Sequence, residues 1–207
     1  FAIAFEGVSA DEIALAEQAL IAGGLPVSEV QRLCDVHAAV FEGSIEEIHQ
    51  PSDPSEIPGH PVNVLKRENR AIEKLIGQIR DYLAKLPNEE AEEELKAALE
   101  TLTAIDRHYL KKENLIFPYM EKYGITAPPK VMWGVDDEIR DELKTLNANL
   151  KTKGAASLKS EINAVLQKVA DMIFKEENIM LPMLLEMLTQ DEWKRIADDS
   201  EEIGYCL

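Results

Sequence analysis

The chain has 207 residues, 45% hydrophobic and 29% charged, which is typical of a globular protein with room for one large domain. Its formal net charge of −17 opposes binding to nucleic acid and to anionic membranes. No apolar run spans a bilayer and two cysteines are too few for a disulfide framework, so we expect a cytoplasmic protein. Because the chain begins at Phe1 with no signal region, we expect it to be part of a longer protein.

The first fifty residues predict a helical hairpin. Two capping-box patterns, each ahead of an apolar-periodic stretch, are separated by a glycine pair: Ser9 with Glu12, Gly23-Gly24, and Ser28 with Gln31. Three prolines within 51–59 then end the second helix and predict a linker. We therefore expect an N-terminal hairpin over 1–50, a proline-rich linker over 51–59 and the main domain from residue 60.

We predict four long antiparallel helices in the main domain, 60–188. Four stretches carry apolar residues at helical spacing and end at proline or glycine: 61 to about 87, 89–123, 129 to about 153, and about 157 to 188. Thr189 with Glu192 predicts a short terminal helix within the final segment, 189–207. Since no segment alternates like a strand, we predict an all-α fold, an antiparallel four-helix bundle with an N-terminal hairpin and a short C-terminal helix.

A repeated segment connects the second and fourth of these helices. Residues 111–118, KKENLIFP, return 64 residues later within 174–182, FKEENIMLP. One helical hairpin cannot bury its apolar stripe alone, so two copies are expected to pack face to face with equivalent positions lining the core. Lys112 and Glu176 occupy equivalent positions, and pseudo-twofold packing predicts that they approach each other.

Several polar residues fall on the predicted inward faces. Lys112 and Glu176 lie within apolar stripes, and His108 lies at the edge of one; flanking positions on the first and third helices hold Glu68, Asn69, and Asp136 or Asp137. Each also has an ordinary interpretation, as a lysine reaching solvent, a solvated glutamate or a half-buried histidine. If these charges are buried together, they require either a metal ion or mutual pairing.

At these residues the sequence resembles the hemerythrin-like, or HHE cation-binding, family over roughly residues 60–188. The resemblance rests on Glu68-Asn69-Arg70-Ala71-Ile72, His108 with Glu113-Asn114-Leu115-Ile116-Phe117-Pro118, Asp137-Glu138-Ile139-Arg140, and Glu176-Glu177-Asn178-Ile179-Met180-Leu181-Pro182. It implies a four-helix bundle that holds two iron ions through histidines and carboxylates.

Residues 9–50 resemble an uncharacterised helical domain found ahead of hemerythrin-like domains in microbial proteins. A PAS sensor module often follows in such proteins, and the tail 201–207 looks like the approach to one. The resemblance therefore implies signal transduction, with a downstream sensor domain or a partner protein. It indicates neither nucleic acid nor membrane as a partner, and the oligomeric state stays open.

Carried over position by position, the resemblance predicts a reduced metal site. Only His108 and Glu176 match the implied ligands, and the other positions hold Asn69, Lys112, Asp137 and Met172. Asp137 still offers an oxygen ligand, Glu68 flanks the same core, and Glu113 is a further carboxylate about 140° round the helix from His108. The candidate ligands for iron or another divalent metal are thus His108, Glu176, Asp137, Glu68 and Glu113.

Three functions follow. The first is a cation-binding sensory or regulatory input module. The second is a metal-free structural or interaction module in which Lys112 pairs with Glu176 and Asp137. The third, a di-iron oxidase or repair enzyme, requires ligands that are absent, and no nucleophilic triad or phosphate loop indicates another enzyme.

The other histidines form a separate group with a cysteine. Cys34 and His37 share a helix face, a spacing that suits a metal, haem or thiol site but is also common in ordinary helices. His49 and His60 follow. His60 precedes Asn69 by about 13 Å of helix, so we expect it not to reach the central site.

Overall fold

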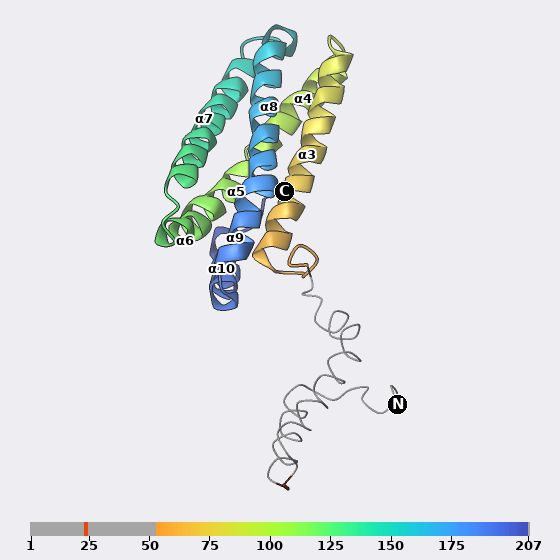
Figure 1. Ribbon diagram of the computed structural model, residues 1–207. Helices are drawn as coiled ribbons and strands as arrows, with labels where there is room; N and C mark the ends of the chain where they lie inside the picture. Colours follow the sequence, from red (N-terminus) through yellow and green to blue (C-terminus); the bar gives the residue numbers. More distant parts are fainter. Residues whose placement is uncertain (1–22, 25–52, 207) are drawn as a thin grey trace, which may run out of the picture. The chain divides into compact units, whose positions relative to one another are not determined.

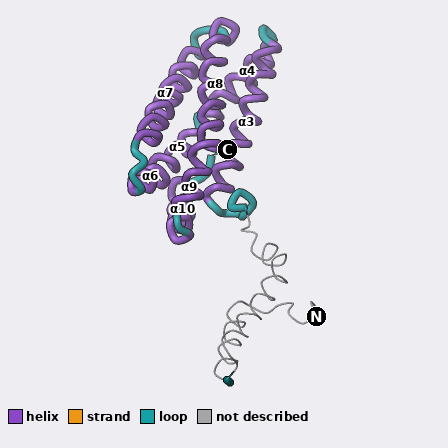
Figure 2. Tube along the Cα trace, in the orientation of Figure 1, coloured by secondary structure: helices purple, strands orange, loops and turns teal. Residues whose placement is uncertain are grey.

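The computed structural model describes residues 23–24 and 53–206. The chain divides into two compact units, Phe1–Ser52 and Asp53–Leu207. The expected N-terminal hairpin, with Cys34, His37 and His49, lies outside the described residues. Over 53–206 the regular elements are all helical, which confirms the all-α prediction (Figure 1; Figure 2).

Four antiparallel segments form a bundle (Figure 1). They are α3 (Pro61–Lys85); α4 (Glu89–Leu102) continued by α5 (Ile105–Lys111) and α6 (Phe117–Lys122); α7 (Ala127–Leu150); and α8 (Lys159–Lys175) continued by α9 (Leu181–Met187). Helix α3 packs on α4, α4 on α7, α7 on α8 and α8 on α3, which closes a ring around one core. A short 3-10 turn, η3 (Ala155–Leu158), precedes α8, and α10 (Gln190–Ile203) packs on α3 and α5.

Local sequence fixes the helix starts. The Asn88 side chain accepts a hydrogen bond from the backbone N–H of Ala91 in the first turn of α4. Thr189 and Glu192 form a complete capping box at α10, as predicted. His60 caps α3 with a ring nitrogen, and its ring lies 5.0 Å from that of Trp193. These caps set where the chain enters α3, α4 and α10.

The repeated segment forms the same irregular turn twice, as the π-helical turns η2 (Lys112–Ile116) and η4 (Glu176–Met180). Each turn leads directly into a proline-containing helix start. A proline has no N–H, and its ring clashes with the carbonyl four residues earlier, so a wider turn relieves the conflict. The expected unbroken helices over 89–123 and 157–188 are therefore interrupted, and the first also breaks between α4 and α5.

An asparagine in each copy supports the wider turn. The side-chain amide of Asn114 donates to the Leu110 carbonyl at 2.9 Å, and that of Asn178 donates to the Phe174 carbonyl at 2.8 Å. Backbone carbonyls that a regular helix would satisfy are thus bonded by side chains. The first residue of each π-helical turn, Lys112 in one copy and Glu176 in the other, is buried in the core.

The core of the bundle is apolar, and all four segments contribute fully buried side chains to it. They include Ile72, Ile79, Leu95, Leu99, Ile139, Ile162, Val165 and Val169.

Among the residues that the structure describes, no helix combines the length and the apolar character needed to cross a membrane.

A buried charge network as the candidate site

Six ionisable side chains are buried together in the bundle, each at most 5% exposed: Glu68, His108, Lys111, Lys112, Asp136 and Glu176. They come from α3, α5, η2, α7 and η4, so every segment of the bundle contributes at least one. A buried ion without a partner is strongly destabilising, so the contacts among these groups decide whether the fold tolerates them.

His108 connects two carboxylates. Its Nδ1 lies 2.9 Å from Glu68 Oε2, and its Nε2 lies 3.0 Å from Glu176 Oε2. An imidazole donates from both nitrogens only when it is protonated. Burial opposes a charge on His108, but Glu176 and Glu68 outweigh burial and raise its pKa. His108 is therefore an imidazolium that bridges the two glutamates.

Lys112 connects the next pair of carboxylates. Its Nζ lies 2.5 Å from Glu176 Oε1 and 3.0 Å from Asp136 Oδ1, and 4.3 Å from the centroid of the Tyr109 ring. Burial opposes ionisation of Glu176, but Lys112 and His108 lower its pKa to about 2. Burial raises the pKa of Asp136 to about 6 against the opposing effect of Lys112. Both carboxyls are consequently ionised at pH 7.

Glu68 ends the network on the other side. Its Oε1 accepts hydrogen bonds from Lys111 Nζ and, at 2.8 Å, from the backbone N–H of Cys206. Burial opposes ionisation of Glu68, but His108, the Cys206 N–H and Lys111 together lower its pKa. Glu68 is thus an ionised carboxylate whose two oxygens contact different parts of the chain.

The charges of the network cancel. Three cations, Lys111, Lys112 and protonated His108, face three carboxylates, Glu68, Asp136 and Glu176. Each cation contacts at least one carboxylate, and Glu68 and Glu176 each contact two cations. With His108 protonated, the network is therefore neutral from its own side chains, which makes its burial tolerable.

Two of the five predicted ligands do not join this network. Asp137 is 59% exposed at its side chain and pairs with Arg140 at 2.8 Å. Glu113 is buried but accepts two hydrogen bonds from the Arg140 guanidinium, at 2.7 and 2.8 Å. Successive residues of a helix point about 100° apart, so Asp136 faces the core and its neighbour does not. Of the two candidates for the inward position, the structure buries Asp136, whereas the resemblance had pointed to Asp137 as the ligand.

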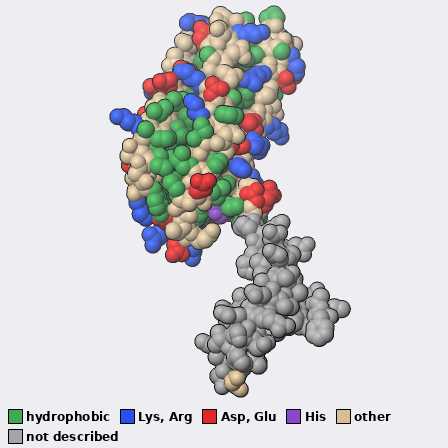
Figure 3. All heavy atoms as spheres, in the orientation of Figure 1, with side chains coloured by type: hydrophobic (Ala, Val, Ile, Leu, Met, Phe, Trp, Pro, Cys, Tyr) green, Lys and Arg blue, Asp and Glu red, His purple; other side chains and the backbone are tan. Residues whose placement is uncertain are grey.

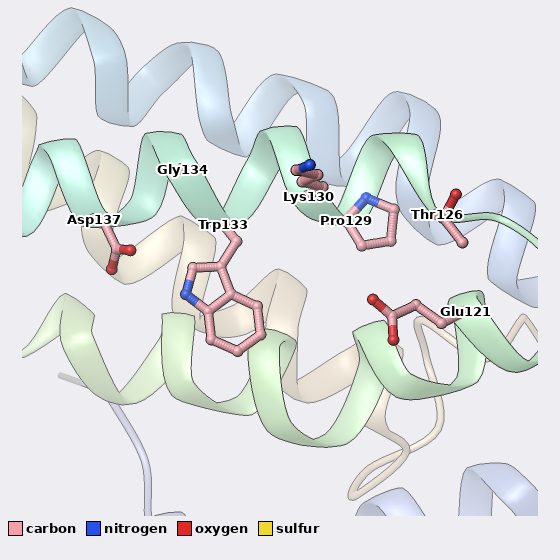
Figure 4. Close-up of a pocket in the computed structure, with 7 residues that line it drawn as sticks. All are labelled: Glu121, Thr126, Pro129, Lys130, Trp133, Gly134 and Asp137. Atoms are coloured by element: carbon pink, nitrogen blue, oxygen red, sulfur yellow. The ribbon is translucent and has the colours of Figure 1, made fainter.

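Asp137 lies instead at a surface groove of about 410 Å³ (Figure 4). Trp133 and Asp137 extend from α7 towards α6, which presents Glu121 on the opposite side. A second hollow, of about 540 Å³, lies beside Arg140 and Lys144. No member of the network lines either hollow, so neither gives access to it.

One face of the bundle is rich in apolar side chains. Figure 3 shows hydrophobic side chains gathered over its lower half in that view. Separately, the large hydrophobic residues exposed on α7, α8 and η4 are Val131, Trp133, Phe174 and Ile179. This apolar surface, like the two hollows, is separate from the charged centre.

Helical phase decides between Asp136 and Asp137, the two candidates that the sequence offered for the inward position of α7. The buried residues of α7 follow one another at spacings of three and four, as Met132, Asp136, Ile139, Leu143, Leu146 and Leu150. Asp136 belongs to that stripe and Asp137 does not. Lys111, Arg140 and Cys206 gave no comparable signal, because their partners depend on how separate helices pack.

The residues in this arrangement do not fit a divalent metal ion. Among the described residues, no group of three or more histidine, cysteine, aspartate or glutamate side chains is placed to hold one. The Lys112 ammonium lies between Asp136 and Glu176, where a cation would have to lie, and both His108 nitrogens contact carboxylates. A metal ion would meet like charge in a medium of low dielectric constant.

The fold and the network define the chain as a four-helix bundle with functional side chains projecting into its centre from facing helices. Residues 60–184 match the family model described as the hemerythrin HHE cation binding domain, and the chain belongs to this family. Residues 1–47 match a family of unknown function, DUF438. Both matches confirm the resemblances seen in the sequence. No curated protein matches the chain.

Proposed function

We propose that this chain is a regulatory module of the hemerythrin family in which a self-neutralised charge network takes the place of a metal centre. The observation that carries the proposal is the Lys112 ammonium, which lies between Asp136 and Glu176 at 3.0 and 2.5 Å. It supplies the positive charge that carboxylates at the centre of such a bundle otherwise obtain from a metal.

The closed geometry favours regulation over catalysis. Every nitrogen or ammonium of the network contacts a carboxylate. The two larger surface hollows are lined by other residues, and Lys111 lines only a hollow of about 10 Å³. Within residues 53–206, none of these hollows offers a position beside the charged groups to a reactant larger than a water molecule. A regulatory role also suits the match of residues 1–47 to a second family in the same chain. We take a downstream sensor domain or a partner protein as the recipient of the signal.

Metal content tests this proposal. The full chain is purified from cells supplied with iron or zinc, and bound metal is measured by mass spectrometry. We expect well under one metal ion per chain, with the same value in the His108→Ala variant. Asp137→Ala, which changes an exposed carboxylate, serves as the control. One or more ions per chain, lost in His108→Ala, would overturn the proposal.

That second outcome would support the cation-binding sensory module. The observation in its favour is that Glu68 and Glu176 already converge on His108, at 2.9 and 3.0 Å. A cation would then have to displace the Lys112 ammonium from between its carboxylates. The metal measurement thus separates the two functions.

A further inference from the structure

The C-terminal segment Gly204–Cys206 returns to the middle of the bundle after α10 ends (Figure 1). Gly204 has φ 83° and ψ −173°, a conformation that is essentially restricted to glycine. Its N–H donates to the Ser200 carbonyl at 3.1 Å, which completes the end of the helix. The end of α10 is therefore capped by Gly204, and the contacts of Tyr205 and Cys206 are not needed to end the helix.

These two residues contact the charge network. The Cys206 N–H donates to Glu68 Oε1 at 2.8 Å, and the Cys206 side chain is 2% exposed. The Tyr205 ring centroid lies 4.9 Å from Lys111 Nζ, and the Tyr205 carbonyl accepts from Arg107 at 3.3 Å. Lys111 also donates to Glu68, so the segment and the network share both of these charged groups.

We propose that Gly204–Cys206 is a strap that is held by Glu68 and released when the buried charge network is disturbed. The contacts form a continuous series in which Lys112 bonds Glu176, Glu176 bonds His108, His108 bonds Glu68, and Glu68 bonds the Cys206 N–H. The two ends of the series are Lys112, in the bundle core, and a backbone amide near the end of the chain.

The physical basis of release is the charge of Glu68. A hydrogen bond from an amide to a carboxylate is about twice as strong as one between neutral groups. His108 holds Glu68 ionised and oriented, and Glu176 does the same for His108. Loss of charge at Glu176 therefore makes the imidazolium form of His108 less stable. This in turn weakens the hydrogen bond from the Cys206 N–H to Glu68, which His108 holds ionised. This inference rests on the proposed function, since it takes the network as the element that changes state.

The Cys206 thiol reports strap release directly. Cysteines occur only at positions 34 and 206, so Cys34→Ser leaves one thiol in the full chain. The rate at which iodoacetamide alkylates the native protein is measured in this background. Glu176→Gln keeps the size of the side chain and does not alter the strap itself. We expect it to raise the alkylation rate at least about tenfold, as loss of one charge-assisted hydrogen bond implies.

General destabilisation is controlled with Leu95→Ala, a fully buried core substitution in α4 outside the network. The two variants are compared at equal distance from their melting temperatures. Faster alkylation in Glu176→Gln than in Leu95→Ala supports the strap. Equal rates, or no change from the parent, overturn it. If Glu176→Gln does not fold, His108→Gln is used with the same criteria.

Coupling of this kind is reciprocal, which gives a second readout. Gly204→Ala strains the turn at a positive φ and is expected to release the strap without replacing any side chain of the network. The imidazole NMR signals of His108 should then shift, whereas a strap without coupling would leave them unchanged. A chain that binds metal yet shows both effects overturns only the proposed function. A metal-free chain without these effects overturns only the strap.

Discussion

Lys112 and Glu176 occupy equivalent positions of a duplicated segment, and their side chains meet in the core with 2.5 Å between Nζ and Oε1. Each residue begins a π-helical turn that a proline of its own copy requires. The duplicated scaffold therefore brings two corresponding positions together, and the opposite charges at these positions make the contact an ion pair. A matched pair of carboxylates there would have needed a cation from outside.

Lys112→Met is expected to lower the free energy of unfolding by about 3 to 5 kcal/mol. Methionine fills a similar volume, so the loss comes from leaving Glu176 and Asp136 buried without their ammonium partner. Urea denaturation followed by circular dichroism measures it. Lys96→Met, which breaks only surface pairs, should have a much smaller effect. An unchanged melting temperature in Lys112→Met would show that the network does not stabilise the fold.

The same substitution should also create a cation site. Without Lys112, the Glu176 and Asp136 carboxylates lose the ammonium group that they share, and both face the position that it occupied. We expect Zn²⁺ or Mn²⁺ to raise the melting temperature of Lys112→Met and to leave that of the parent chain unchanged. A ligand that binds the native state but not the unfolded state stabilises the native state. Metal stabilisation of the parent to the same extent would contradict the replacement of the metal by the ammonium.

Asp136 should give the protein a distinctive pH dependence. Its pKa is raised from 3.8 to about 6 in the folded state, so between these values the folded chain holds a proton that the unfolded chain has lost. Its contribution to stability therefore decreases as pH rises from about 4 to 6, by up to about 3 kcal/mol. Glu176, whose folded pKa is about 2, acts in the opposite direction, and its contribution is lost as pH falls below 4.5.

Comparison with Asp136→Asn isolates the effect, because Glu176 is present in both proteins. The difference in unfolding free energy, parent minus variant, should decrease from pH 4 to 6 and become constant above about 6.5. Urea denaturation at a series of pH values provides the measurement. A difference that does not vary with pH would show that Asp136 titrates as an exposed aspartate does.

The sequence was sufficient for the architecture because the relevant signals are local. Helical periodicity and the caps at Asn88 and Thr189 are read within a few residues, and they agree with the structure. The duplication also predicted the approach of Lys112 to Glu176, which the contact confirms. The prolines in the repeat were visible as well, but the wider turns that they cause were not anticipated.

The rest of the site depends on contacts between distant segments. Lys111 and Lys112 are adjacent in the sequence, yet each reaches a different carboxylate, because successive residues of a helix point about 100° apart and different helices lie on the two sides. The return of Cys206 to Glu68 joins residues 138 positions apart, and no local pattern marks it. The family resemblance directed attention to Asp137 by motif alignment, whereas helical phase identifies Asp136.

Arg140 is expected to stabilise the fold through Glu113, which it holds by both carboxylate oxygens at 2.7 and 2.8 Å. Arg140→Met should lower the unfolding free energy by about 2 to 3 kcal/mol, since it leaves a buried carboxylate unpaired. Arg140→Lys keeps the charge but not the two-pronged geometry, so an intermediate loss is expected. Thermal and urea denaturation measure both variants.

Two further variants separate this contribution from that of Asp137, the exposed partner of the same arginine. Asp137→Ala should change the unfolding free energy by less than about 0.5 kcal/mol, because an exposed ion pair contributes little. Combining Arg140→Met with Glu113→Gln should recover most of the stability, since the buried charge is removed together with its partner. If the double variant is as unstable as Arg140→Met alone, the arginine stabilises the bundle by packing on Tyr109, whose ring centroid lies 5.6 Å from it, and not by pairing with Glu113.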